Sequence, residues 1–321
     1  MPLTISCAFA TSPESHEHAR IAESLGYRRA FFYDSPPLYP DVWVQLCRAA
    51  ERTERIVLGP GVLVPSNRHP MANAAAIATL VGIAGEERVV VAVGSGFTGR
   101  MAMGQRALPW RDVAEYVRAL QALLRGERIE WDGAAVEMLH SPGFAPPRPI
   151  RVPFVIGAGG PKGIAVAHEL GDGVFGGAPI GGFDWSIVLT FGTVLRDGED
   201  GASPRVADCA GHAAAMMLHY GAEHGGLDEQ AEQWRAAYDD VPERERHLAM
   251  HYGHLVLVHE RDRPFVTPQL IQGFGMALDP AAWREKLAAL EQDGATEIAY
   301  QPAGPDIPAE LEAFASAARA G

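Results

Sequence analysis

The sequence predicts an α/β protein of the (β/α)8 TIM-barrel class. Short apolar runs alternate along the 321 residues with amphipathic helical patterns, which is typical of parallel strands joined by helices. Eight strand-like runs fit a closed barrel better than an open doubly wound sheet. Four glycine-rich or acidic loops follow predicted strands, and barrels of this class build their sites from such loops.

The pattern assigns each element in turn. Runs rich in Val, Ile, Leu and aromatic residues predict strands at 3–8, 29–33, 56–58, 88–93, 154–156, 173–175, 205–209 and 296–300. Amphipathic spacing predicts helices at 12–25, 42–51, 70–84, 110–125, 161–170, 187–195, 280–292 and 309–320. Residues 128–139 indicate a hairpin. The stretch 211–278 is too long for one βα unit, so we expect an insertion or lid there, within a single domain spanning 1–321.

Composition limits the classes of partner. The net charge of −13 argues against binding to nucleic acid or to an anionic membrane surface. The first residues lack the basic and apolar regions of a signal peptide, and no apolar run approaches the about 20 residues of a membrane span. Cys7, Cys47 and Cys209 show neither disulfide nor zinc spacing. We expect a cytoplasmic protein that acts on a small-molecule substrate.

The loops after strands two to four carry candidate site residues. Asp34 lies at a strand end, where its carboxyl group could exchange a proton, form a hydrogen bond to a cofactor ring or make an Asx turn. His69 stands just before a predicted helix, where it could donate a hydrogen bond to a ligand or cap the helix. The segment Gly94-Ser95-Gly96 can line a cofactor or make a tight turn. The GxG at 59–61 lacks the third glycine and the acidic residue of a dinucleotide fingerprint.

The loop after strand five is a candidate phosphate cradle. Gly159 and Gly160 allow backbone N–H groups to approach an anion, and the helix that follows adds the positive end of its dipole. Pro161 suits the first helical turn, and Lys162 adds a charge. The alternative is an ordinary βα turn in a glycine-rich protein.

Three histidines could share a helical face, namely His247, His251 and His254. Such an arrangement can bind a metal, but histidines of this kind are more often solvated or packed. We therefore assign no metal ligand from the sequence.

Several segments resemble the luciferase-like superfamily, and within it the branch that uses coenzyme F420. That branch includes methylenetetrahydromethanopterin reductase and F420-dependent glucose-6-phosphate dehydrogenase. The matching segments are TERIVLGPGV at 53–62, RHP at 68–70, ATL at 78–80, VAVGSG at 91–96, VPFVIG at 152–157, GPK at 160–162, LGDGV at 170–174 and DGATEI at 293–298. The resemblance covers residues 1 to about 180 well and 276–321 fairly.

The resemblance implies roles at these positions. Gly61-Val62 corresponds to a non-prolyl cis peptide that supports the face of the flavin-like ring. The segment 94–96 corresponds to the loop beside the cofactor side chain, and 159–162 to the phosphate-binding turn. Asp34 corresponds to the acidic residue of an Asp-His pair near the deazaflavin. Ser35 replaces the histidine of that pair, so we hypothesise that His69 substitutes for it in part.

The expected function is hydride transfer between F420 and a small organic substrate. Arg68, Arg100 and Lys162 are candidates for binding a polyglutamate tail. An FMN-dependent two-component monooxygenase, a non-catalytic flavin-binding protein and a metal-dependent barrel hydrolase are the alternatives. The resemblance also implies a homodimer, formed through helices beside strands two and three. Aromatic residues of the poorly matched region could line a substrate pocket or belong to the core: Trp185, Phe191, Trp234, Tyr238 and Phe274.

Overall fold

Eight parallel strands form the barrel. The computed structural model describes residues 3–225 and 228–319. The sheet order is β3-β2-β1-β12-β9-β8-β7-β4, and bridges between Leu58 and Val89 and between Leu63 and Val93 join its two outer strands. The prediction of a (β/α)8 barrel is confirmed. The strands are β1 Thr4–Phe9, β2 Arg29–Phe32, β3 Val57–Pro60, β4 Val91–Gly94, β7 Phe154–Gly157, β8 Gly173–Gly176, β9 Ser186–Phe191 and β12 Glu297–Gln301.

Helices cover the outside of the barrel. They are α1 Ser15–Ser24, α2 Val42–Ala50, α3 Pro70–Ala84, α5 Trp110–Arg125, α6 Pro161–Leu170, α11 Pro280–Gln292 and α12 Ile307–Arg319. Alternate strand residues face the two sides. Phe31 and Ala92 pack inside the barrel, whereas Phe32 and Val91 pack against the helices. This alternation explains why the strands are apolar on both faces.

Short elements complete the first half of the chain. They are η1 Pro65–Asn67, η2 Glu86–Arg88, α4 Phe97–Met101, β5 Ile129–Trp131 and β6 Ala134–Val136. The last two pair antiparallel, which confirms the predicted hairpin. Its turn residues Asp132 and Gly133 both have positive φ, as tight hairpin turns require.

The seventh strand is not where the sequence analysis placed it. Residues 187–195, expected as a helix, form β9 and then β10 Thr193–Val194. Residues 205–209, expected as a strand, lie inside α7 Pro204–His224. The β-branched and aromatic side chains of β9 favour a strand, and the Ser203 hydroxyl accepts from the N–H of Val206 to cap a helix that begins with proline.

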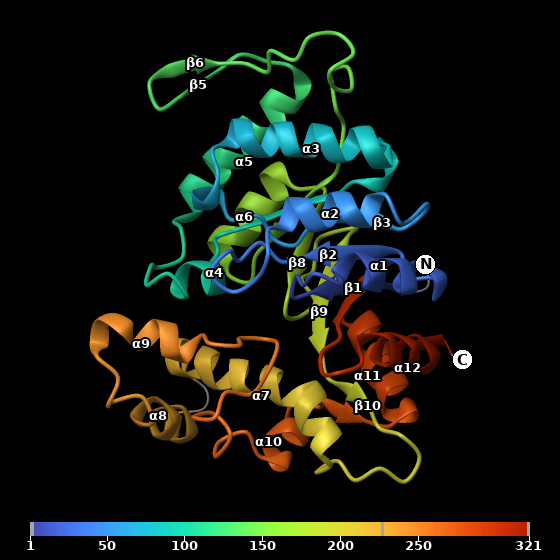
Figure 1. Ribbon diagram of the computed structural model, residues 1–321, viewed down its shortest axis with the longest axis vertical. Coiled ribbons are helices and arrows are strands. Elements are labelled where there is room, and N and C mark those ends of the chain that lie inside the picture. The colour runs from blue at the N-terminus through green and yellow to red at the C-terminus, as the bar shows by residue number, and fades with distance from the viewer. Residues whose placement is uncertain (1–2, 226–227, 320–321) are drawn as a thin grey trace.

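A group of helices follows β10. They are α7, α8 Asp228–Ala236, α9 Glu243–Met250 and α10 Pro268–Gly273, and the chain then returns through β11 Ala277–Leu278, which pairs with β10. In Figure 1 they gather at one end of the molecule, and α2, α3 and α5 lie toward the other. The expectation that 211–278 acts as a lid stays a prediction.

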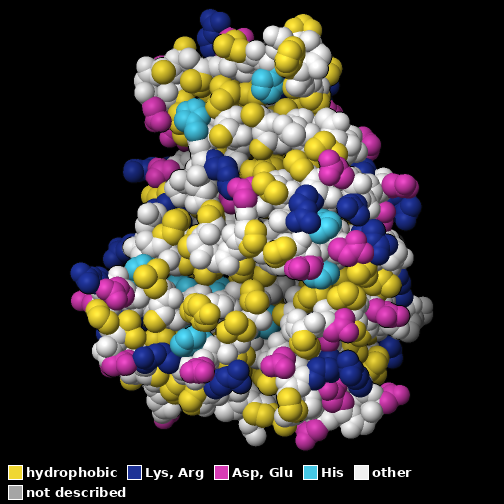
Figure 2. Space-filling model, in the orientation of Figure 1, with side chains coloured by type: hydrophobic (Ala, Val, Ile, Leu, Met, Phe, Trp, Pro, Cys, Tyr) yellow, Lys and Arg dark blue, Asp and Glu magenta, His cyan; other side chains and the backbone are white. Residues whose placement is uncertain are grey.

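The surface carries both kinds of charge. On the face shown in Figure 2, acidic and basic side chains are interspersed. Within 3–225 and 228–319, no helix is both long and apolar enough to cross a membrane.

Candidate active site

A cavity of about 200 Å3 opens at the C-terminal ends of β2 and β3. Four residues predicted for the site line it: Asp34, Gly61, Val62 and Gly96. A hollow of about 660 Å3 lies beside the β5–β6 hairpin, but its lining comes mainly from η1, α5 and the hairpin. We take the smaller cavity as the candidate site because active sites of barrels lie at the C-terminal ends of the strands.

Asp34 is held in an ion pair that the sequence analysis did not foresee. Its side chain is 1% exposed, and Arg68 donates to its Oδ1 at 2.7 Å. The N–H of Val64 and the amide of Asn67 also donate to Oδ2, both at 3.4 Å. Because the carboxylate is paired with a guanidinium, Asp34 is suited to orient a ligand rather than to remove a proton.

Arg68 bridges two acids. Its other terminal nitrogen donates to Asp41 at 2.7 Å, and Asp41 also caps α2 through the N–H groups of Trp43 and Val44. Burial of Arg68 disfavours its charge, but the hydrogen bonds and charges of Asp34 and Asp41 outweigh that effect and raise the pKa of Arg68. Both terminal nitrogens of Arg68 are therefore occupied by Asp34 and Asp41. This pairing argues against the candidate role of Arg68 in binding a polyglutamate tail.

Val62 projects between two glycines of neighbouring strands. The Gly61-Val62 peptide bond is cis, as the resemblance implied. A Cβ placed on Gly94 would lie 2.8 Å from Cγ2 of Val62, and one on Gly157 would lie 2.8 Å from its Cγ1. Gly94 and Gly157 are thus required by the packing of Val62, which sequence reasoning had not found.

Gly96 and Gly99 each lie close to a side chain beside the cavity. Gly96 has φ +76°, and a Cβ on it would lie 2.4 Å from Cγ1 of Val64. A Cβ on Gly99 would lie 3.0 Å from the Ser35 hydroxyl. The larger histidine that the resemblance places at position 35 would therefore meet α4. The backbone carbonyl of Ser95 accepts from the N–H of Leu108, which ties this loop to the start of α5.

His69 lies outside this cavity. Its ring is exposed, its Nδ1 accepts from the N–H of Met71 at the start of α3, and it contacts the ring of Trp131 edge-on at 6.0 Å. Of the two readings left open by the sequence, the structure supports the helix cap. His69 is not placed to stand in for the histidine missing at Ser35.

The candidate phosphate cradle is an open helix start. Gly160 precedes α6 without a side-chain cap, and Pro161 occupies the first turn. A Cβ on Gly159 or Gly160 would meet nothing within 4 Å, and Lys162 is exposed. The first N–H groups of α6 can therefore receive an anion. No contact among these residues tests that role, which stays a prediction.

Several residues of the site carried no signal in the sequence. Leu189 of β9 and Leu255 line the apolar side of the cavity. The Tyr33 hydroxyl donates to Gln301 at 2.8 Å, and the Gln301 amide donates to the carbonyl of Leu255 at 2.9 Å. Burial raises the pKa of Tyr33 well above its usual value, so its phenol stays neutral. The first contact joins residues 268 positions apart and the second joins residues 46 positions apart, and a local pattern reveals neither.

The aromatic residues suggested for a substrate pocket do not line this cavity. Trp234 and Tyr238 are fully buried and donate to Asp262 at 2.6 and 2.7 Å. Trp185 donates to Glu297 at 2.8 Å, at the other end of β12. Phe191 and Phe274 pack with α7 and α10. All five side chains contribute to the packing of the protein interior, which was the alternative interpretation of these aromatic residues.

The fold and the sequence both match known proteins. A family model described as luciferase-like monooxygenase matches residues 10–297. A 5,10-methylenetetrahydromethanopterin reductase of Archaeoglobus fulgidus is 31% identical over 166 residues, 50% of this chain and 48% of the relative. An F420-dependent glucose-6-phosphate dehydrogenase of Beutenbergia cavernae is 37% identical over 172 residues, 48% of this chain and 49% of the relative. The chain spans about half the length of the curated relatives it matches.

Solved structures share the whole fold at low identity. The coenzyme F420 dependent tetrahydromethanopterin reductase from Methanopyrus kandleri aligns with a TM-score of 0.70 at 20% identity, over 98% of both chains. A type II Baeyer–Villiger monooxygenase of Pseudomonas putida, in complex with FMN, aligns with a TM-score of 0.60 at 13% identity, over 99% of this chain and 98% of that one. At such identities the likeness concerns the fold.

Proposed function

Because the chain belongs to the luciferase-like monooxygenase family, we propose that it is an oxidoreductase that uses coenzyme F420. The substrate is a small organic molecule, bound beside the deazaflavin ring at the ends of β2 and β3. One observation carries the proposal: the strand-end cavity brings Asp34, Val62 and Gly96 together around a space that no side chain fills.

The residues present fit a flat ring with a phosphate-bearing side chain. Val62 stands over Gly94 and Gly157, so its isopropyl group offers a firm apolar support to one face of a ring. The glycines before α6 leave room for a phosphate group, because a Cβ there would meet nothing. Lys162 and the N–H groups of the first turn of α6 supply the positive charge that a phosphate needs.

When bound, F420 would exchange a hydride with the substrate at C5 of its ring. Val62 would support one face of the ring and leave the other face open to substrate. Asp34 accepts hydrogen bonds while its charge is balanced by Arg68, so it orients the ring or the substrate. Leu189 and Leu255 keep water from the apolar side of the cavity.

FMN is the alternative cofactor. FMN is bound in one solved structure of the same fold, and the matching family model is described as that of a monooxygenase. Ser35, where the resemblance implies a histidine, removes one feature specific to deazaflavin chemistry. The same cavity would then hold reduced flavin, with oxygen as the second substrate.

Side-by-side fluorescence titration distinguishes the two cofactors. We expect F420 to bind at micromolar concentration or tighter and FMN to bind at least ten-fold more weakly. The variant Lys162→Ala should weaken F420 binding without changing the unfolding temperature, since this side chain is exposed. The reverse preference would assign the protein to FMN, and binding of neither cofactor would refute the proposed site.

A further inference from the structure

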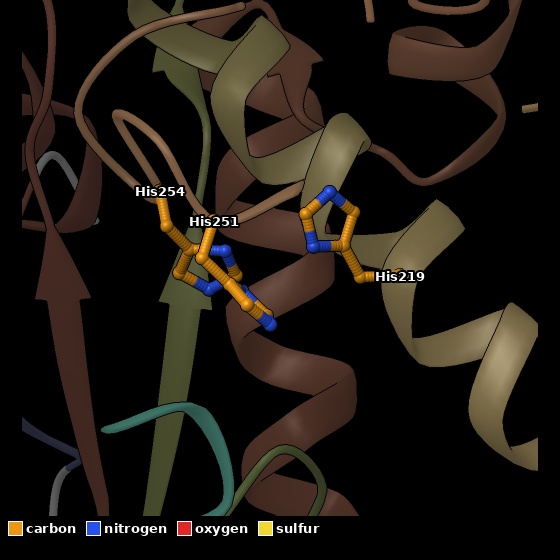
Figure 3. Close-up of side chains that lie close together, drawn as sticks. All are labelled: His219, His251 and His254. Atoms are coloured by element: carbon orange, nitrogen blue, oxygen red, sulfur yellow. The ribbon is translucent and has the colours of Figure 1, made fainter. Parts of the chain in front are cut away.

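Three histidines from two separate segments meet in the interior beside α7. His219 lies on α7, His251 follows α9 directly, and His254 lies three residues further on. One ligand atom from each lies within 4.8 Å of the other two. Their residues are only 7%, 6% and 7% exposed. Figure 3 shows the ring of His219 facing the rings of His251 and His254.

The cluster is short of hydrogen bonds. Both ring nitrogens of His219, Nδ1 of His251 and Nε2 of His254 are buried without a hydrogen-bond partner. Buried polar atoms in folded proteins are nearly always paired, because an unpaired one forfeits its hydration. Four such atoms in one cluster indicate that something absent from the polypeptide completes it.

The protonation state of the three imidazoles allows them to bind a cation. Burial lowers the pKa of His219 to about 3 and that of His251 to about 4, and it lowers the pKa of His254 well below its usual value. All three imidazoles are therefore neutral near pH 7, and a neutral ring nitrogen is the form that binds a metal.

Aromatic packing fixes one member of the cluster. Trp234 stacks on His219 at 4.4 Å, and its indole N–H donates to Asp262 at 2.6 Å. The Tyr238 hydroxyl donates to the same carboxylate oxygen at 2.7 Å. Asp262 is thus engaged by aromatic donors and leaves the histidine nitrogens unpaired, while the stack holds the ring of His219 in place.

We propose that His219, His251 and His254 form a binding site for one divalent transition-metal ion such as Zn2+. Three imidazole nitrogens suit zinc, copper, nickel or cobalt rather than calcium or magnesium, which prefer oxygen. Zn–N bonds of about 2.0–2.1 Å place tetrahedral ligand nitrogens about 3.3 Å apart, so small side-chain rotations close the cluster around an ion. The three nitrogens leave a coordination position for water.

The ion fastens one wall of the candidate active site. The carbonyl of His254 accepts from the Tyr39 hydroxyl at 2.6 Å, and the next residue, Leu255, lines the strand-end cavity. A metal that joins α7 to the turn carrying His251 and His254 therefore holds Leu255 in position. His247, the third histidine considered from the sequence, is not in the cluster, and its place is taken by His219.

Cobalt titration of the tag-free protein tests the site. After treatment with a chelator, the wild type should bind one Co2+ per chain with visible d–d absorption, and Zn2+ should displace it. Zn2+ should also raise the unfolding temperature, because a ligand of the folded state alone stabilises that state. A wild type that gives neither signal with Co2+ or Zn2+ would overturn the proposal.

Matched variants locate the ion. His219→Phe keeps an aromatic ring against Trp234 but removes both nitrogens, and His251→Asn provides a second, smaller change; both should lose Co2+ binding and the Zn2+-dependent stabilisation. His259→Asn should retain both, since His259 lies outside the cluster and an asparagine can still accept from the N–H of Arg261. Unchanged Co2+ stoichiometry and spectrum in folded His219→Phe or His251→Asn would contradict the assignment.

Discussion

The pairing of Asp34 with Arg68 defines the candidate site at the scale of single residues. The carboxylate is buried, and its guanidinium partner also binds Asp41, so one arginine ties the ends of β2 to the start of α2. A buried carboxylate without a partner is costly, because neither water nor a counter-charge then balances it. The ion pair therefore sets both the local stability and the polarity of the cavity.

Arg68→Ala should lower the free energy of unfolding by about 3 kcal/mol, since it leaves Asp34 buried and unpaired. Arg68→Lys should recover only part of the loss, because an ammonium does not reproduce the fork that reaches both acids. Urea unfolding measures both changes. Arg20→Ala is the control, because it breaks an exposed pair with Glu17 and should have little effect. Equal losses in Arg68→Ala and Arg20→Ala would be inconsistent with this structure.

At the scale of elements, helix starts decide which candidate residues are structural. His69 caps α3, Asp41 caps α2 and Ser203 caps α7, each through a side-chain atom that accepts a backbone N–H. The start of α6 has no such cap. Its free N–H groups are therefore available to a ligand, whereas Nδ1 of His69 is already used by the N–H of Met71.

His69→Ala should cost about 1 kcal/mol of stability through the lost cap and leave F420 affinity unchanged. Chemical unfolding and fluorescence titration of the same preparation give the two numbers. His69→Asn, which restores a good cap, should recover the stability. A loss of F420 affinity in both variants would instead support a role for His69 in the site.

The helices between β9 and β12 should make the protein sensitive to acid. The pKa of His219 is lowered by burial to about 3, against an ordinary value of 6.5. Below pH 6.5 the unfolded chain binds a proton that the folded chain does not, so stability falls as pH decreases from 6.5 toward 3. At pH 5 this one residue should cost about 2 kcal/mol relative to pH 8.

Urea unfolding at pH 8 and pH 5, in the presence of a chelator, measures that loss. His219→Phe should reduce the difference between the two pH values, because phenylalanine does not titrate. His168→Phe is the control: His168 is exposed on α6, so its substitution should leave the difference unchanged. The same pH dependence in His219→Phe and wild type would show that His219 is not buried as a neutral ring.

At the scale of the whole molecule, the sequence predicted most of the barrel and part of the site. Seven of the eight strands and the hairpin were located because their apolar runs are short and bounded by glycine, proline or aspartate. The seventh strand was misplaced because the segment SIVLTF shows neither the apolar periodicity of a helix nor the alternation of a half-buried strand. Active sites of barrels lie at the C-terminal ends of the strands, and this rule correctly grouped Asp34, Val62 and Gly96 in one site.

Contacts between distant segments escaped prediction. Arg68 with Asp34, Leu255 with Gln301, and His219 with His254 each depend on how separate loops return to one end of the barrel. Helical spacing suggested that His247, His251 and His254 share one face. Only the fold shows that the third member of the cluster is His219 and not His247. Likewise, only the structure shows that position 94 requires glycine because Val62 packs against it.

The proposed homodimer has a candidate surface on α2 and α3. Val44 and Ile83, on these helices, are 57% and 41% exposed. Light scattering should give twice the mass of one chain for the wild type. The double variant Val44→Glu, Ile83→Glu should be monomeric, because charges are costly in an apolar interface. Leu139→Glu, an exposed position near the hairpin, should remain dimeric, and a monomeric wild type would rule out the dimer.

We propose that the strand-end cavity binds the ring of F420, and a crystal structure of the complex would show where the ring lies. We expect the ring against Val62, with Asp34 at its polar edge and the phosphate at the start of α6, near Gly159 and Lys162. A ring bound elsewhere, for instance in the hollow beside the β5–β6 hairpin, would contradict it.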